Sequence, residues 1–290
     1  MVKVLSIIMC IVSVFAVMTV NARADESKRA ILVVSFGTSY ADTREVTIEA
    51  CEQKIAEAFS DYEVRRAFTS NIIIKILKER DNILVDTPEE ALQKLQDEGF
   101  SEVIVQPLHV IPGAEFHDVV QIVNTYKSAF DSIRLGMPLL AATEDYVATI
   151  EALTSQFPEL QDDEAVVFMG HGTHHPANAS YAALQEVFEN QGLSNVFMGT
   201  VEGYPALDHV IAHLQVQQIK KVTLMPFMLV AGDHAQNDMA GDEEDSWKMI
   251  LKKEGFVVDT YLHGLGENPA IQDLYVKHVQ DAIHGEEGSH

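Results

Sequence analysis

The sequence has few cysteines and few basic residues, and both shortages limit what the protein can be. Only Cys10 and Cys51 occur, and Cys10 lies in an apolar leader, so we expect no disulfide within the chain. Stability must then come from a hydrophobic core. Lys and Arg number 20 against 44 Asp and Glu, a formal net charge of −24. This charge argues against a nucleic acid or an anionic membrane surface as partner, because both bind basic patches.

Three common catalytic signatures are also missing from the sequence. It contains no Walker loop, no G-x-G-x-x-G segment after a predicted strand and no G-x-S-x-G turn. We therefore expect neither a nucleotide cofactor nor serine-hydrolase chemistry.

Residues 1–24 have the anatomy of a secretory signal peptide. Lys3 precedes an apolar run over residues 4–20, and an A-x-A cleavage signal ends at Ala24. An uncleaved membrane anchor is the alternative, because the run approaches the length of a short membrane span. We expect cleavage near Ala24, no stable membrane span afterwards and a periplasmic mature protein.

Four continuous apolar runs predict strands that are buried on both faces: residues 30–38, 102–110, 165–173 and 221–230. Helical patterns lie between them. One covers residues 43–59, and another covers residues 87–99, where Thr87 is the expected N-cap and Pro88 the first helical residue. Strands that alternate with helices at this spacing predict a parallel α/β sheet.

The chain also repeats itself. Three pairs of residues lie in or just after corresponding apolar runs, in the same order: Gly37 with Gly172, Pro107 with Pro226, and Gly113 with Gly232. This pattern predicts two similar doubly wound α/β halves, residues 25–158 and 159–290, with a cleft between them. Chance similarity of two strand–turn units is the alternative.

Ligands of doubly wound sheets bind beyond the carboxyl ends of the strands, so the residues that follow the strands mark the expected site. In the second half these residues include His171 and His234. Phe36 and Glu115 stand at the corresponding positions of the first half. We therefore expect the reactive groups on the second half's side of the cleft.

Three side chains of the second half have donor atoms for a metal ion. His171 lies between two glycines, Glu202 follows a short apolar run, and His234 follows the run 221–230 and Gly232. Two imidazoles and a carboxylate suit Co²⁺, Ni²⁺, Fe²⁺ or Zn²⁺, and each can accept a proton. The spacings form no tight local motif, so a hydrolase, a metal carrier and a metal transferase all remain open.

Five segments of the sequence resemble those of the CbiK-type sirohydrochlorin cobaltochelatases, class II chelatases related to ferrochelatase. The segments are VVSFGTSYADTRE, QPLHVIPGAE, MGHGTHHPAN, TVEGYP and MLVAGDHAQNDMAGDEEDSWK. The resemblance implies two α/β halves around a tetrapyrrole cleft and metal insertion without ATP. The family's metal-site residues map onto His171, Glu202 and His234.

The resemblance also suggests how a tetrapyrrole would be held. Phe36, Leu108 and Met228 are candidates to pack against the ring, with ordinary core packing as the alternative for each. Backbone N–H groups near Gly37 and the cation of Arg44 are candidates to bind the carboxylates of the substrate.

Two functions from different classes follow. The leading hypothesis is an exported enzyme of cobalamin or tetrapyrrole biosynthesis that inserts Co²⁺ into sirohydrochlorin, with Fe²⁺ as a second candidate metal. The alternative is a periplasmic haem or metal binding or transport protein with a chelatase fold. His117 is its candidate haem ligand, and a solvated histidine is the plain reading of that residue. The apolar segment NIIIKILKE and the chelatase resemblance favour a homo-oligomer, although its isoleucines could also face the core.

Overall fold

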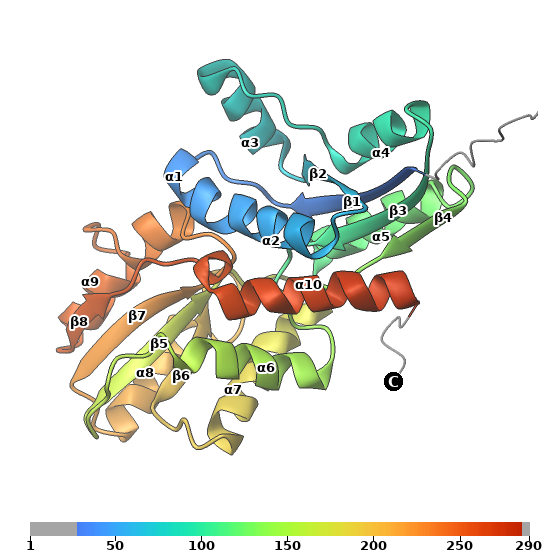
Figure 1. The fold of residues 1–290 in the computed structure, drawn as a ribbon. Coiled ribbons are helices and arrows are strands. Elements are labelled where there is room, and N and C mark those ends of the chain that lie inside the picture. The colour runs from blue at the N-terminus through green and yellow to red at the C-terminus, as the bar shows by residue number, and fades with distance from the viewer. Residues whose placement is uncertain (1–27, 286–290) are drawn as a thin grey trace, which may run out of the picture.

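Two parallel four-stranded sheets, one in each half of the chain, form the frame of the molecule (Figure 1). The computed structural model describes residues 28–285, so the expected signal peptide lies outside the described part. The first sheet has the order β2-β1-β3-β4 and the second the order β6-β5-β7-β8. The strands are β1 (Lys28–Ser35), β2 (Glu63–Phe68), β3 (Phe100–Pro107), β4 (Ser132–Leu135), β5 (Glu164–Gly170), β6 (Val196–Thr200), β7 (Lys221–Phe227) and β8 (Val257–Thr260).

Helices connect the strands and cover the sheets. Those of the first half are α1 (Ala41–Arg44), η1 (Glu45–Glu49), α2 (Ala50–Ala58), α3 (Asn71–Ile76), η2 (Leu77–Asp81), α4 (Pro88–Asp97), α5 (Ala114–Thr125) and α6 (Thr143–Thr154). Then come η3 (Pro176–Asn178), α7 (Ala179–Asn190), α8 (Leu207–Val216), η4 (Ala235–Met239), α9 (Trp247–Lys253), η5 (Leu265–Glu267) and α10 (Pro269–His284). The N-cap predicted at Thr87 is confirmed, because its side chain accepts a hydrogen bond from Glu90 N–H in a full capping box.

The identical strand orders confirm the repeat that the sequence predicts. Each strand of the first sheet has a counterpart in the second, and every pairing is parallel. The halves differ between their second and third strands. The first half places α3, η2 and α4 there, whereas α8 alone joins β6 to β7. This insertion explains why the spacing between matching residues shrinks along the chain.

The strands end earlier than the apolar runs predict. The four predicted runs end at residues 38, 110, 173 and 230, whereas the strands end at Ser35, Pro107, Gly170 and Phe227. Gly37 has φ +94° and Gly172 has φ +81°, which is left-handed backbone that cannot continue a strand. The last residues of these runs therefore belong to the loops that follow the strands.

One hydrophobic cluster joins the two halves. It includes Phe68 of the first sheet, Phe168 of the second and Tyr275 of α10, all fully buried. Two further clusters cover the far face of each sheet. The Tyr275 hydroxyl donates to the carbonyl of Leu108 at 3.0 Å, which ties α10 to the end of β3.

Two helices, one from each half, pack across the halves. The boundary at residues 158 and 159 falls between α6 and β5, yet α6 packs against α7 of the second half. In the other direction, α10 packs against α2 and β3 of the first half (Figure 1). Each half thus holds its own sheet, while the helical cover is partly exchanged. The boundary itself stays a prediction.

Candidate metal centre

Three neighbouring strands of the second sheet deliver the expected site residues. β6, β5 and β7 lie side by side, and their carboxyl ends lead to Glu202, His171 and His234 respectively. The backbone pairing of β5 with β6 continues past both strands, because Glu202 N–H donates to the His171 carbonyl at 2.8 Å. The sheet therefore places these residues at one edge, as the sequence predicts.

The structure brings the two histidines into contact. The ring centroids of His171 and His234 lie 4.7 Å apart with an interplanar angle of 85°. His171 Nδ1 lies 2.9 Å from the Gly172 carbonyl, and His234 Nδ1 lies 2.5 Å from Asp238 Oδ2. Since both oxygens can only accept, Nδ1 carries the proton in each ring. Both Nε2 lone pairs are left free to bind a metal ion.

Gly172 allows the loop after β5 to lie against the loop after β6. A Cβ atom at Gly172 would come within 2.8 Å of the Glu202 carbonyl carbon and of Gly203 N, besides requiring the strained φ. Tyr181 stabilises the turn, because its hydroxyl oxygen accepts a hydrogen bond from Gly172 N–H at 3.4 Å. Burial raises the pKa of Tyr181 to about 12, so this hydroxyl stays neutral.

Glu202 lies next to the histidine pair without joining it. Its side chain is exposed, and within residues 28–285 no three His, Cys, Asp or Glu side chains are close enough together to hold a metal ion. A hydrogen bond holds the backbone of Glu202 to that of His171. To join His171 and His234 around one metal ion, Glu202 must therefore change its side-chain torsion angles.

A contact across the cleft joins the first half to the metal-site loop. The Tyr40 hydroxyl donates to Asp233 Oδ1 at 3.2 Å, and Asp233 is the neighbour of His234. Burial and the nearby Asp233 carboxylate raise the pKa of Tyr40. Sequence reasoning missed Tyr40, because no local pattern links residues 193 positions apart. Asp238 could have been found, since an Asp four residues after a histidine lies on the same helical face.

The expected tetrapyrrole-packing residues lie in different environments. Phe36 is 48% exposed at the end of β1 and can offer its ring to a ligand. Met228 is partly buried. Leu108 is 1% exposed and belongs to the hydrophobic cluster that joins the halves. Its environment is therefore ordinary core packing, the alternative to packing against a ring.

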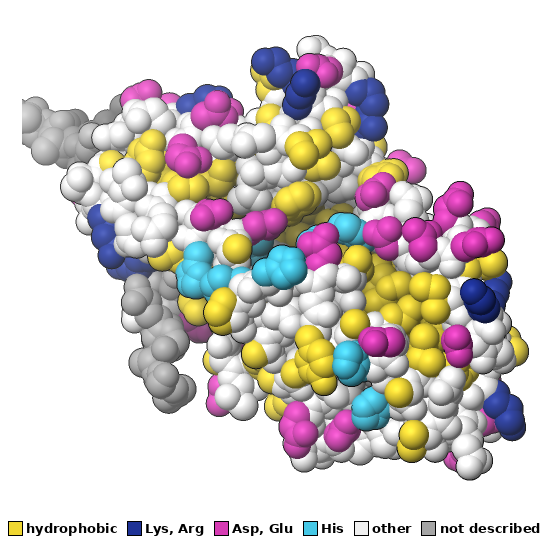
Figure 2. All heavy atoms as spheres, turned by 180° about the vertical axis from the view of Figure 1, so that it is seen from behind, with side chains coloured by type: hydrophobic (Ala, Val, Ile, Leu, Met, Phe, Trp, Pro, Cys, Tyr) yellow, Lys and Arg dark blue, Asp and Glu magenta, His cyan; other side chains and the backbone are white. Residues whose placement is uncertain are grey.

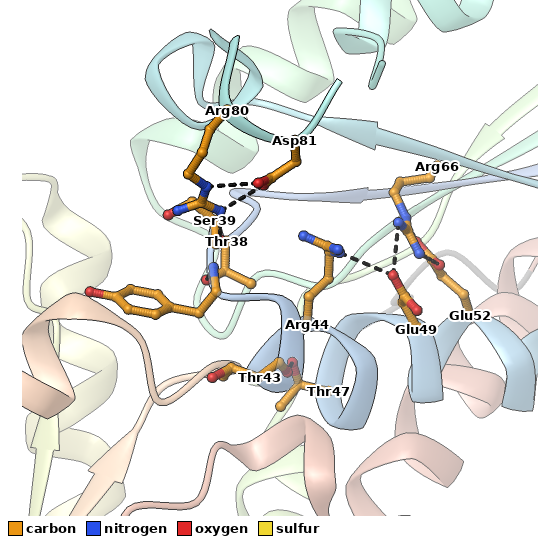
Figure 3. A network of polar contacts seen from close by, with 11 residues as sticks. Thr38, Ser39, Thr43, Arg44, Thr47, Glu49, Glu52, Arg66, Arg80 and Asp81 are labelled. Atoms are coloured by element: carbon orange, nitrogen blue, oxygen red, sulfur yellow. Dashed lines mark hydrogen bonds and ion pairs between the residues drawn. The ribbon is translucent and has the colours of Figure 1, made fainter. Parts of the chain in front are cut away.

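Arg44 is held in an ionic network with Glu49, Arg66 and Glu52 (Figure 3). Its side chain is 9% exposed, and its Nε donates to Glu49 at 3.0 Å. Glu49 also accepts a hydrogen bond from Arg66, and Arg66 forms an ion pair with Glu52. Among the described residues Arg44 Nη1 has no hydrogen-bond partner, so its two N–H bonds remain for a ligand or water. Arg80 donates to the Ser39 carbonyl in the loop after β1.

Histidine and acidic side chains gather along the seam between the halves, around a hollow with hydrophobic side chains in its depth (Figure 2). Two histidines also meet between the halves, because Nδ1 of His117 on α5 lies 2.9 Å from Nε2 of His175 in the second half. The seam thus combines an apolar interior, suited to a flat ring, with imidazoles at its margin.

Comparisons with known proteins show the family of the chain. The family model described as cobalt chelatase (CbiK) matches residues 29–284. The sirohydrochlorin cobaltochelatase of Salmonella typhimurium is 47% identical over 256 residues, covering 88% of this chain and 97% of that protein. The sirohydrochlorin cobaltochelatase CbiKC of Nitratidesulfovibrio vulgaris is 38% identical and covers 89% and 91% respectively.

A solved structure supports the fold. SirB from Bacillus subtilis with Fe³⁺ superposes with a TM-score of 0.63 at 18% sequence identity, over 90% of this chain and 98% of that one. At this identity the likeness concerns the fold alone. It agrees with the two similar α/β halves expected from the sequence.

Proposed function

The chain belongs to the cobalt chelatase (CbiK) family, and we propose on that basis that it inserts Co²⁺ into sirohydrochlorin without hydrolysing a nucleotide. Both curated relatives described above bear the name sirohydrochlorin cobaltochelatase. The observation that carries the proposal is the contact between His171 and His234, which offers two free Nε2 lone pairs at the margin of the cleft.

The site residues divide the chemistry between them. Insertion takes up one Co²⁺ ion and releases two pyrrole N–H protons, so the protein must hold the ion and accept protons. His171 and His234 bind the ion through Nε2, leaving its other positions open to the pyrrole nitrogens. Glu202, on the adjoining loop, completes the ligand set when its side chain turns inward and accepts a proton as the ion leaves.

A direct assay tests this function. Purified protein is mixed with sirohydrochlorin and Co²⁺ at fixed pH, and the change in tetrapyrrole absorbance is followed against a protein-free control. We expect insertion well above the spontaneous rate, with no requirement for ATP. Equal rates with and without protein would refute the function.

Iron is the second candidate metal, because two imidazoles and a carboxylate bind Fe²⁺ as well as Co²⁺. Anaerobic assays with each metal alone and with both together give the preference of the enzyme.

The carrier alternative has less support, since both curated relatives are named as enzymes. Haem binding at His117 would give a Soret band in the purified protein that is lost on His117→Ala.

Export and self-association complete the proposal. The apolar run and the cleavage signal of residues 1–24 support a periplasmic location, which N-terminal sequencing of the mature protein tests. No helix within residues 28–285 is long and apolar enough to cross a membrane.

Helix α3 has no fully buried residue, and Ile72 is 73% exposed, which supports a homo-oligomer. Light scattering at the monomer mass would refute association.

A further inference from the structure

A second pair of histidines bridges the two halves. His117 comes from α5 of the first half, and His175 comes from the loop after β5 in the second half. Their ring centroids lie 4.6 Å apart with an interplanar angle of 72°. The corresponding values for His171 and His234 are 4.7 Å and 85°. The seam therefore contains two histidine pairs of nearly the same geometry, and the loop after β5 contributes one ring to each.

The spacing of the second pair suits a metal ion. His117 Nδ1 lies 2.9 Å from His175 Nε2. An ion about 2.1 Å from each of two adjacent nitrogens in octahedral geometry places those nitrogens about 3.0 Å apart. His117 is exposed and His175 is partly exposed, so a hydrated ion can reach both rings and keep water in its remaining positions.

The proton on His175 makes this pair weaker than the first. Ala177 N–H donates to His175 Nδ1 at 3.1 Å, so the ring proton sits on Nε2 and points at His117. Metal binding must move that proton to Nδ1 and break the hydrogen bond from Ala177, which weakens the affinity of this pair for the ion. Within residues 28–285 no further donor completes a three-residue site. The first pair needs no such rearrangement.

From these features we infer that His117 and His175 form a second, weaker site for a divalent transition-metal ion, from which the ion passes to His171 and His234. His175 is four positions after His171, so their Cα atoms lie within about 14 Å of each other even along an extended chain. The ion binds more weakly to His117 and His175 than to His171 and His234, so its transfer from the first of these pairs to the second lowers its free energy. The loading role rests on the proposed insertion of Co²⁺, whereas the binding itself does not.

Titration of the metal-free full chain with Co²⁺ alone tests the binding, through the visible absorption of the bound ion. The His171→Ala variant serves as the background, because it disables the first pair. We expect this background to retain a weak Co²⁺ equivalent. Adding His117→Ala removes it, and so does His175→Asn, which keeps an acceptor for Ala177 N–H. Adding His284→Ala, an exposed histidine at the end of α10, leaves it in place.

The outcomes separate this site from the proposed function. Retention of the equivalent in both the His117→Ala and His175→Asn chains would overturn the site, as would its loss with His284→Ala. A haem Soret band that depends on His117 would also overturn it. In the otherwise unchanged chain, His117→Ala should raise the KM for Co²⁺ several-fold more than it lowers kcat, and an unchanged KM would overturn the loading role. A wild-type chain that binds Co²⁺ here but inserts none would refute the proposed function alone.

Discussion

The two halves have the same strand order but carry different residues beyond their strands. β5 and β7 lead to His171 and His234, whereas β1 and β3 lead to Phe36 and, at the start of α5, Glu115. Phe36 is an exposed ring, and Glu115 lies 3.3 Å from His109 Nε2. One duplicated framework therefore places two imidazoles beyond the strands on one side, and an exposed aromatic ring and a carboxylate on the other. The few residues after each strand, and not the strands, decide the chemistry.

The largest expected effect comes from removing either histidine of the second half. His171→Ala or His234→Ala should lower Co²⁺ insertion by several orders of magnitude, because each removes an Nε2 ligand. The free energy of unfolding in urea should change by less than about 0.5 kcal/mol, as is usual for side chains outside the core. Glu115→Ala is the matched change in the first half and should retain most of the activity. Near-wild-type rates in both histidine variants would remove the asymmetry between the halves.

Glu202→Gln should have the next largest effect. It keeps the size of the side chain but removes a carboxylate ligand and proton acceptor. We expect insertion to slow by about a hundredfold, in the range of positioned acid–base groups. Steady-state assays at saturating sirohydrochlorin measure it. An unchanged rate would show that the exposed position of Glu202 persists during turnover and that the histidines act without it.

Asp238→Asn should slow insertion about tenfold, because Asp238 holds the proton of His234 on Nδ1 and so frees Nε2. An amide can turn its NH₂ group toward Nδ1 and favour the wrong tautomer. Asn237→Ala changes a neighbouring side chain that bonds to Asp233 instead, and serves as the control. Comparing the affinities of the two variants for Co²⁺ separates orientation of His234 from a general disturbance of the loop.

Four glycines sharpen the comparison at the level of the backbone. Gly37 and Gly172 have positive φ and no room for a Cβ atom, whereas Gly113 and Gly232 have neither restriction. Alanine at Gly37 or Gly172 should therefore destabilise the fold by about 1–3 kcal/mol. Alanine at Gly113 or Gly232 should cost less than about 1 kcal/mol. Urea unfolding of all four variants tests whether each pair behaves alike across the halves.

The smallest expected effect concerns the contact between the halves. Tyr40→Phe removes the bond to Asp233 and should lower the free energy of unfolding by less than about 1 kcal/mol, because the bond is exposed. Thermal unfolding measures the change. A loss of several kcal/mol would mean that Tyr40 fastens the halves together more strongly than one exposed hydrogen bond can.

Much of the frame could be predicted from the sequence, since buried strands, caps and the repeat have local patterns. The apolar runs that contain Gly37 and Gly172 predict two similar α/β halves, and the sequence places His171 and His234 after strand ends. Contacts between distant segments could not be predicted in this way. Neither the bond between Tyr40 and Asp233 nor the contact between His117 and His175 has a sequence signature. The exposed side chain of Glu202 also has none, because a torsion angle is not encoded in spacing.

The position of α10 has a consequence for the order of folding. During synthesis the first sheet is complete once β4 has been made, but part of its cover is residues 269–284, made more than a hundred positions later. Until then the core cluster around Phe68 lacks Tyr275 and its neighbours in α10. We therefore expect a nascent chain of the first half alone to stay open to proteases, and the whole molecule to unfold in one cooperative transition. Because α10 packs against the first half, the cores of both halves become complete only when this helix has been made and has docked.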